Sequence, residues 1–145
     1  MQFNNGPQRT VGFQQRRRNA AVDFTFYIPP EVFPSPSFTR AALVLTGRHF
    51  YISSLWARED GDHETSGRDV FAQLKAVLAE AGSDMRHMAK ATYYVSDDET
   101  SGVLNVLRPE LFDPKRPPAA SKATVHGVGR PGRTLSVDMI AVGTK

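Results

Sequence analysis

With 145 residues, the chain is long enough for one hydrophobic core and too short for two independent ones, so we expect a single domain. Hydrophobic residues make up 40% and charged residues 23%, as in an ordinary soluble globular protein, and the absence of cysteine excludes disulfides, thiolate metal sites and cysteine nucleophiles. Four of the 18 basic residues precede the first acid, Asp23, so the rest of the chain carries 14 basic against 15 acidic residues and is almost neutral. The net charge of +3 therefore does not indicate a nucleic-acid-binding domain.

The first segment, residues 1–22, is a polar and basic N-terminal arm, and residues 23–145 form the expected domain. Up to about residue 20, the large apolar side chains are only Phe3, Val11 and Phe13, too few to offset the entropy of ordering the arm, so we expect it to be mobile or docked on a neighbour. Arg16–Arg18 could grip phosphates, but we favour a solvated arm over a nucleic-acid site. The polar start lacks a secretory signal and no stretch approaches the roughly 20 apolar residues of a membrane span, so we expect a cytoplasmic protein that does not associate with membranes.

Strand-like segments follow the arm. Residues 23–28 are aromatic and β-branched and are followed by several prolines, which predicts a short edge strand and an extended connection. The apolar segments 40–45 and 49–55 are separated by three residues that include Gly47, and this spacing predicts a β-hairpin. Residues 57–64 are mostly polar and are predicted to form a loop.

The next segment has the period of an amphipathic helix. Its apolar residues fall on one helical face and are Val70, Leu74, Val77, Leu78 and Ala81. Thr65 or Ser66 can cap its start, and Gly82 can end it in a left-handed conformation.

The C-terminal half alternates strands with a helix. Residues 88–95 predict a strand, and Val103, Leu104, Leu107 and Leu111 mark a second helix that Gly102 and Pro109 weaken. Two final strands, 121–128 and 134–142, are joined by a Gly- and Pro-rich turn. This order predicts a mixed sheet with both helices on one face, and the other face then needs a cover that self-association would supply.

In this order the segments resemble the Rid family, also called the YjgF or L-PSP endoribonuclease family, over roughly residues 36–142. The segments that carry the resemblance are Phe50-Tyr51-Ile52-Ser53-Ser54, residues 73–82, residues 90–97, Asn105, Pro118-Ala119-Ala120-Ser121 and residues 137–141. The resemblance implies a chorismate-mutase-like α+β fold with a mixed six-stranded sheet, two helices on one face and a homotrimer with clefts between the subunits. It also implies hydrolysis of reactive enamines and imines to a keto acid and ammonia, without a cofactor.

The family holds a substrate carboxylate with an arginine in a Pro-Ala-Arg-Ser motif, and Ala120 stands at that position here. Lys122, two residues further along the same strand face, is a candidate replacement, with a solvent-facing lysine as the alternative. Arg40 and Arg116 are weaker candidates, because the sequence does not show where either side chain points.

The other cleft positions match the family in part. Phe38 replaces the cleft tyrosine, Ser54 replaces a glycine, and Ser53 and Asn105 match directly. Asp138 stands at the family's acidic position, one methylene shorter than the usual glutamate. The resemblance makes it the candidate for acid–base catalysis or water positioning.

Other polar clusters predict no further site. The four histidines, His49, His63, His87 and His126, lack metal-ligand spacing, so we expect no metal. Three hypotheses remain for function: a trimer that binds an enamine, imine or carbonyl metabolite and, if it is an enzyme, deaminates it; a non-catalytic binding protein of the same fold; and an RNA-cleaving protein, for which the arginine-rich arm is the only local support.

Overall fold

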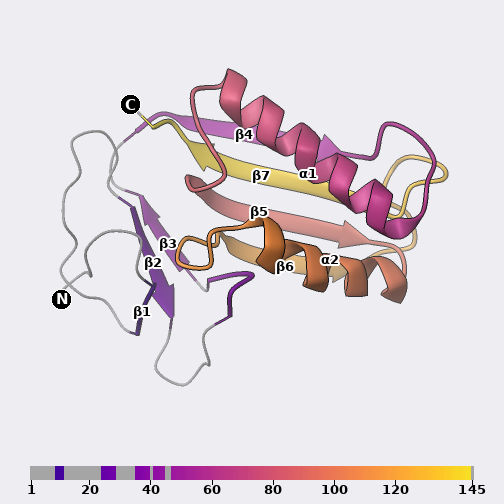
Figure 1. Cartoon of the computed structure of the whole chain (residues 1–145), viewed down its shortest axis with the longest axis horizontal. Coiled ribbons are helices and arrows are strands. Elements are labelled where there is room, and N and C mark those ends of the chain that lie inside the picture. Colours follow the sequence, from indigo (N-terminus) through magenta and orange to yellow (C-terminus); the bar gives the residue numbers. More distant parts are fainter. Residues whose placement is uncertain (1–8, 12–23, 29–34, 40, 45–46, 145) are drawn as a thin grey trace.

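The main sheet contains four strands in the order β4-β7-β5-β6 (Figure 1). They are β4 (His49–Leu55), β7 (Leu135–Val142), β5 (Met88–Val95) and β6 (Ala119–Thr124). β7 is antiparallel to both β4 and β5, whereas β5 and β6 are parallel. The structure is a computed structural model and describes residues 9–11, 24–28, 35–39, 41–44 and 47–144.

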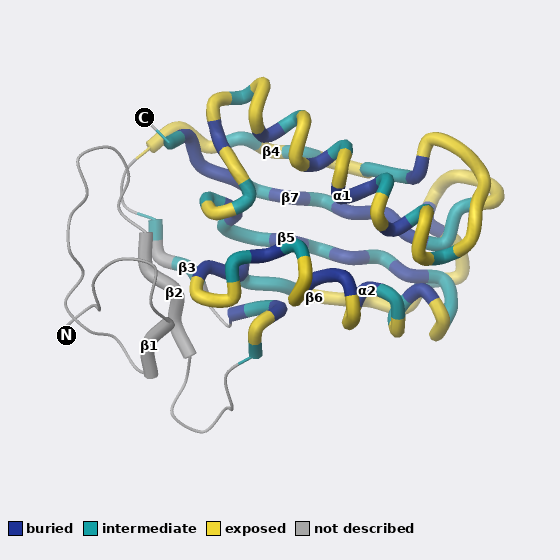
Figure 2. The backbone as a smooth tube through the Cα atoms, in the orientation of Figure 1, coloured by how far each residue is buried: buried dark blue, intermediate teal, exposed yellow. Residues whose placement is uncertain are grey.

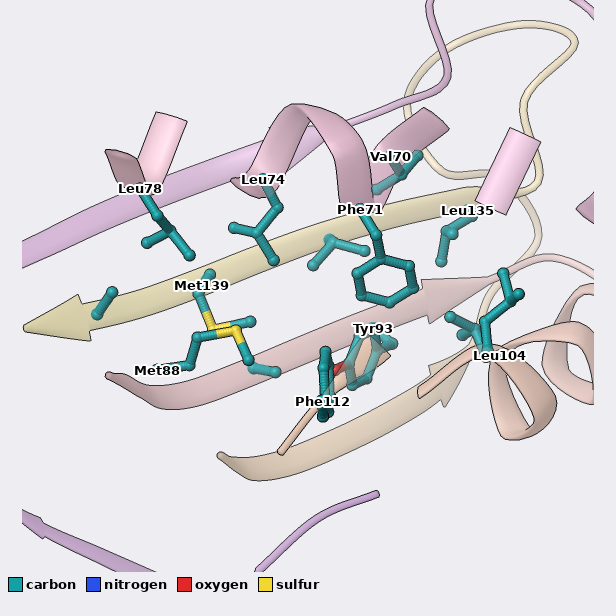
Figure 3. Packing of buried hydrophobic residues seen from close by; sticks show 14 of the residues in the cluster. Val70, Phe71, Leu74, Leu78, Met88, Tyr93, Leu104, Phe112, Leu135 and Met139 are labelled. Atoms are coloured by element: carbon teal, nitrogen blue, oxygen red, sulfur yellow. The ribbon is translucent and has the colours of Figure 1, made fainter. Parts of the chain in front are cut away.

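Two helices, α1 (His63–Glu80) and α2 (Asp98–Leu111), cover one face of this sheet, which we call the helix face. Figure 2 shows buried residues where the helices meet the strands and exposed residues on the outer side of each helix. In Figure 3, Phe71 and Leu74 of α1 and Leu104 of α2 point toward Tyr93 and Met139 of the sheet. The predicted α+β class with both helices on one face is confirmed.

The helix starts differ from the prediction. The side chain of Asp62 accepts a hydrogen bond from the Thr65 backbone N–H at 2.7 Å, so α1 begins within the predicted loop, and the predicted cap at Thr65 or Ser66 is wrong. Asp97 caps α2 in the same way through the Thr100 N–H, also at 2.7 Å. Carboxylate oxygens accept well from the free N–H groups of a first helical turn, which explains why an aspartate takes the capping position in both helices. After α1, Gly82 has a φ of 80°, as predicted for a left-handed end.

Three further strands form a separate sheet. β1 (Arg9–Val11) runs parallel to β2 (Phe24–Ile28), and β2 is antiparallel to β3 (Ala41–Val44). The predicted hairpin between residues 40–45 and 49–55 is therefore wrong, and the strands expected in one six-stranded sheet are divided between two sheets. Pairing of β4 with β7 places Ile52 opposite Met139 on the helix face, where Ile52 packs against the core. A hairpin between neighbouring segments would not by itself bury Ile52 in this way. Apart from residues 9–11, which form β1, the predicted N-terminal arm lies outside the described residues.

Strand register decides which side chains share a face of the main sheet. Residues paired across neighbouring strands point to the same side, and residues two apart along a strand do so as well. Lys122 of β6, Tyr93 of β5 and Val137 of β7 are paired in one row on the helix face. Ser121, Thr92 and Asp138 form the next row, on the opposite face, which we call the open face. At one end of the open face Ala42 and Val44 pack against the buried Val142.

Candidate functional site

Asp138 is held in place on the open face by the backbone of β4. The N–H of Ser54 donates to Asp138 Oδ1 at 2.7 Å. Ser54 lies where the β4–β7 pairing shifts register between Ile52 and Leu55, and it has a φ of 52°. A β-bulge of this kind redirects the backbone, and here it turns an N–H toward a carboxylate. Within the described part of the chain, Oδ2 accepts no hydrogen bond, so one oxygen is available to a ligand or water.

A pocket of about 320 Å³ surrounds this carboxylate, and we call it the Asp138 pocket. Its lining comes from β4, β5 and β7 and consists of Tyr51, Ile52, Ser53, Lys90, Thr92, Asp138, Met139 and Ile140. Tyr51 is 75% exposed, so an aromatic ring stands at its margin. The pocket thus combines an acid, a cation and hydroxyl groups.

Lys90 is the cation of the Asp138 pocket. Its Nζ donates to Ser121 Oγ at 2.9 Å and to the Ala91 carbonyl at 3.0 Å. Burial lowers the pKa of its ammonium group below the ordinary value for lysine. Lys90 therefore brings a partly desolvated positive charge to the face that carries Asp138.

A second pocket, of about 250 Å³, lies on the other side of the sheet between α2 and the edge strand β6, and we call it the Arg108 pocket. It is lined by Phe38, Asn105, Arg108, Ala120, Ser121 and Lys122. Arg108 Nη2 donates to Asn105 Oδ1 at 2.9 Å, and Lys122 Nζ lies 3.3 Å from the same oxygen. A guanidinium from α2 thus stands in the pocket whose wall includes Ala120.

The predicted site residues separate into two groups. Ser53, Ser54 and Asp138 gather at the Asp138 pocket, whereas the Arg108 pocket collects Phe38, Asn105, Ala120 and Lys122. The row that contains Asp138 faces away from the helices, and Ala120 and Lys122 face toward them. Within one chain the two groups therefore form two pockets, not one.

Three functional candidates were missed by the sequence reasoning: Lys90, Thr92 and Arg108. Lys90 and Thr92 join Asp138 only through the β5–β7 register, which has no local signal. Arg108 had a signal, since it follows Leu104 by four positions and Leu107 by one, on the apolar side of α2. A charged residue in such a stripe needs a partner.

The remaining candidates lie elsewhere. Arg116 Nε donates to the Arg86 carbonyl at 2.6 Å and does not line the Arg108 pocket, and Arg40 lies outside the described residues. Among the described residues, no three histidine, cysteine or acidic side chains are grouped so that they could hold a metal ion. No described helix has the length and apolar character needed to cross a membrane.

Comparisons with known proteins agree with this fold. A family model described as endoribonuclease L-PSP matches residues 37–143. Three similar solved structures are a YjgF-family protein from Neisseria meningitidis (22% identity, 85% of this chain and 97% of that chain covered, TM-score 0.64), the Rid-family protein YyfB from Yersinia pestis (22%, 82% and 98%, 0.74) and Mmf1 from yeast (20%, 83% and 98%, 0.61). A comparison with curated proteins found no match.

Proposed function

Because the chain belongs to the endoribonuclease L-PSP family, which is also called the Rid or YjgF family, we propose that it is a homotrimer that binds small imines or enamines of keto acids in clefts between subunits and hydrolyses them. The observation that carries this proposal is the Asp138 carboxylate, fixed through Oδ1 by the Ser54 N–H at 2.7 Å. Its other oxygen faces a pocket that also contains Ser53 and Lys90.

The chemistry asks for a group that moves protons and holds water. An enamine such as 2-aminoacrylate first takes a proton on carbon to become an imine. Water then adds to the imine carbon, and the carbon–nitrogen bond breaks to release ammonia and the keto acid. A carboxylate with one fixed and one available oxygen can orient the water and take its proton, which is the role proposed for Asp138.

The division of the site into two pockets supports the trimer. In a closed ring each interface joins two different patches of the same chain, so groups on two faces of one subunit meet across a subunit boundary. The open face carries Asp138 and an exposed Tyr51, and the edge beside β6 carries Asn105 and Lys122. Assembly that brings these patches together would reunite the predicted cleft residues. It would also cover the sheet face that has no helix.

The experiment generates 2-aminoacrylate with a serine dehydratase and follows release of pyruvate and ammonia with and without the protein. We expect acceleration over the spontaneous reaction and, in Asp138→Asn, a loss of about 100-fold or more. Asp98→Asn removes an exposed carboxylate from the first turn of α2 and serves as the matched control.

Two results would count against this function. Undiminished turnover in Asp138→Asn would remove the role of Asp138, and a stable monomer in sedimentation equilibrium would remove the cleft between subunits. A protein that binds pyruvate but never exceeds the spontaneous rate would be a binding protein of this family without turnover.

A further inference from the structure

Two cations converge on one oxygen in the Arg108 pocket. Arg108 is only 6% exposed, and its Nη2 donates to Asn105 Oδ1. Lys122 Nζ reaches the same amide oxygen at 3.3 Å and donates to Ser101 Oγ at 2.5 Å. One neutral acceptor is thus shared by two positive charges.

No described carboxylate balances these charges. Arg58, Arg68, Arg86 and Arg133 each form an ion pair with an aspartate or glutamate, whereas neither Arg108 nor Lys122 lies within 4.0 Å of an acid in the described part of the chain. Burial lowers the pKa of Lys122, and the positive charge of Arg108 lowers it further. A buried charge is normally paired, and Arg108 is buried without an acid while the exposed Lys122 adds a second positive charge, so this pocket has a surplus of positive charge that an anion would neutralise.

The guanidinium of Arg108 is already fixed before any ligand arrives. Its Nε donates to the Leu104 carbonyl at 3.3 Å, and its carbon lies 5.0 Å from the centroid of the Tyr93 ring. The guanidinium is therefore held through Nε, through Nη2 and over the face of the Tyr93 ring. A preorganised guanidinium loses little freedom when it binds a carboxylate, which strengthens the contact.

The remaining walls select a small ligand with a short apolar part. Ala120 offers only a methyl group beside the guanidinium, and Phe38 adds an aromatic surface. The pocket volume of about 250 Å³ lies below the range of about 300–1,000 Å³ typical of sites for drug-sized ligands.

We propose that the Arg108 pocket binds the carboxylate of a small keto or imino acid, with Arg108 and Lys122 as its two cationic ligands and Asn105 holding both in position. As a role in turnover, this rests on the proposed function, because the anchored acid would then be the substrate or product. Arg108 reaches the pocket from α2, and it places a guanidinium beside Ala120 without any arginine on β6.

The test is equilibrium binding of pyruvate to the full chain, measured by titration calorimetry without any dehydratase. We expect saturable binding by the unmodified protein and a Kd weakened roughly tenfold or more in both Arg108→Met and Lys122→Met. Arg130→Met and Lys115→Met remove exposed cations outside the pocket and should bind like the unmodified protein. Neutral pyruvamide should not bind.

Lys122 is exposed, so Lys122→Met tests the site even if Arg108→Met fails to fold, which circular dichroism and thermal melting will show. Absence of saturable pyruvate binding, or the same Kd in Lys122→Met as in the unmodified protein, would overturn the proposal. Tighter binding of inorganic phosphate than of pyruvate, lost in the same variants, would overturn the assignment to a carboxylate.

Failure of this proposal is distinguishable from failure of the proposed function. Pyruvate binding that depends on Arg108 in a protein without turnover would leave the anion site standing and remove the catalysis. Turnover by a protein that does not bind pyruvate saturably would leave the catalysis standing and remove the anion site.

Discussion

The N–H of Ser54 donates to Asp138 Oδ1 across the irregular part of the β4–β7 pairing, at 2.7 Å. Ser54 is the one described residue other than glycine with a positive φ, 52°. Ser54 therefore orients the candidate catalytic acid from a left-handed backbone conformation. This conformation costs a residue with a Cβ about 1–2 kcal/mol. The strain lies beside the functional group that it positions.

Ser54→Gly should therefore stabilise the protein and keep the hydrogen bond to Asp138. Relief of the left-handed conformation is partly offset by the greater freedom of glycine in the unfolded chain, leaving a gain of about 0.5–1 kcal/mol in the free energy of unfolding. Urea denaturation followed by the fluorescence of Trp56, the single tryptophan, measures this gain. A loss of stability would show that the serine side chain makes a contribution larger than the strain.

The helix caps give a second prediction. Asp62→Ala removes the acceptor for the Thr65 N–H and should lower the free energy of unfolding by about 1 kcal/mol. Ser66→Ala is the matched control, because Ser66 lies inside α1 and its Oγ makes only a 3.5 Å contact with the Gly61 carbonyl. Thermal unfolding of both variants decides between the two positions, and a larger loss in Ser66→Ala would restore the cap predicted from the sequence.

Local patterns were sufficient to predict the elements, but not how they pair. The strand predicted at residues 88–95 is β5, and Val70, Leu74 and Leu78 of the predicted helical face lie in the core, whereas Val77 and Ala81 are only partly buried. Such periodicity reports a face that must be buried and carries no information about which strand lies alongside. For that reason residues 40–45 and 49–55 were assigned to one hairpin, although β3 and β4 belong to different sheets.

The candidate site was predictable to the same extent. Asn105 and Ala120 are predicted from motif positions and Lys122 from its place on the same strand face as Ala120, and the structure brings the three together in one pocket. The role of Arg108 was missed, because it depends on how α2 packs beside β6. There the buried guanidinium of Arg108 and the ammonium group of Lys122 share the Asn105 side-chain oxygen. Spacing along a sequence places a residue on a face, and only the pairing of the elements shows what it faces.

Tyr93 supplies a third prediction. The Arg108 guanidinium lies over its ring, while its buried hydroxyl makes no hydrogen bond of good geometry within the described structure. Burial raises the pKa of this hydroxyl, and the charge and weak hydrogen bonding of the nearby Arg108 oppose the rise only in part, so the group stays neutral. Tyr93→Phe keeps the ring and removes the unsatisfied oxygen, and we expect the free energy of unfolding to rise by up to about 1 kcal/mol. In the same urea experiment, destabilisation by Tyr93→Phe would reveal a partner for the oxygen.

The fourth prediction concerns pH and follows from Lys122. Burial and the charge of Arg108 lower its pKa, and a bound carboxylate would favour the charged form and raise it again. Pyruvate should therefore bind best at pH values below the pKa of the free lysine and more weakly as the pH rises through it. Arg108 stays charged throughout, so binding weakens without vanishing.

The stability of the ligand-free protein should change in the opposite direction over the same range. A lysine with a lowered pKa binds fewer protons in the folded than in the unfolded state, so its contribution to the free energy of unfolding rises with pH. Pyruvate titrations from about pH 7 to about 10.4, the ordinary pKa of lysine, measure how the affinity for pyruvate depends on pH. Lys122→Met should flatten this binding profile, and Lys115→Met should leave it intact. An unchanged profile in Lys122→Met would mean that Lys122 does not carry the charge that the anion senses.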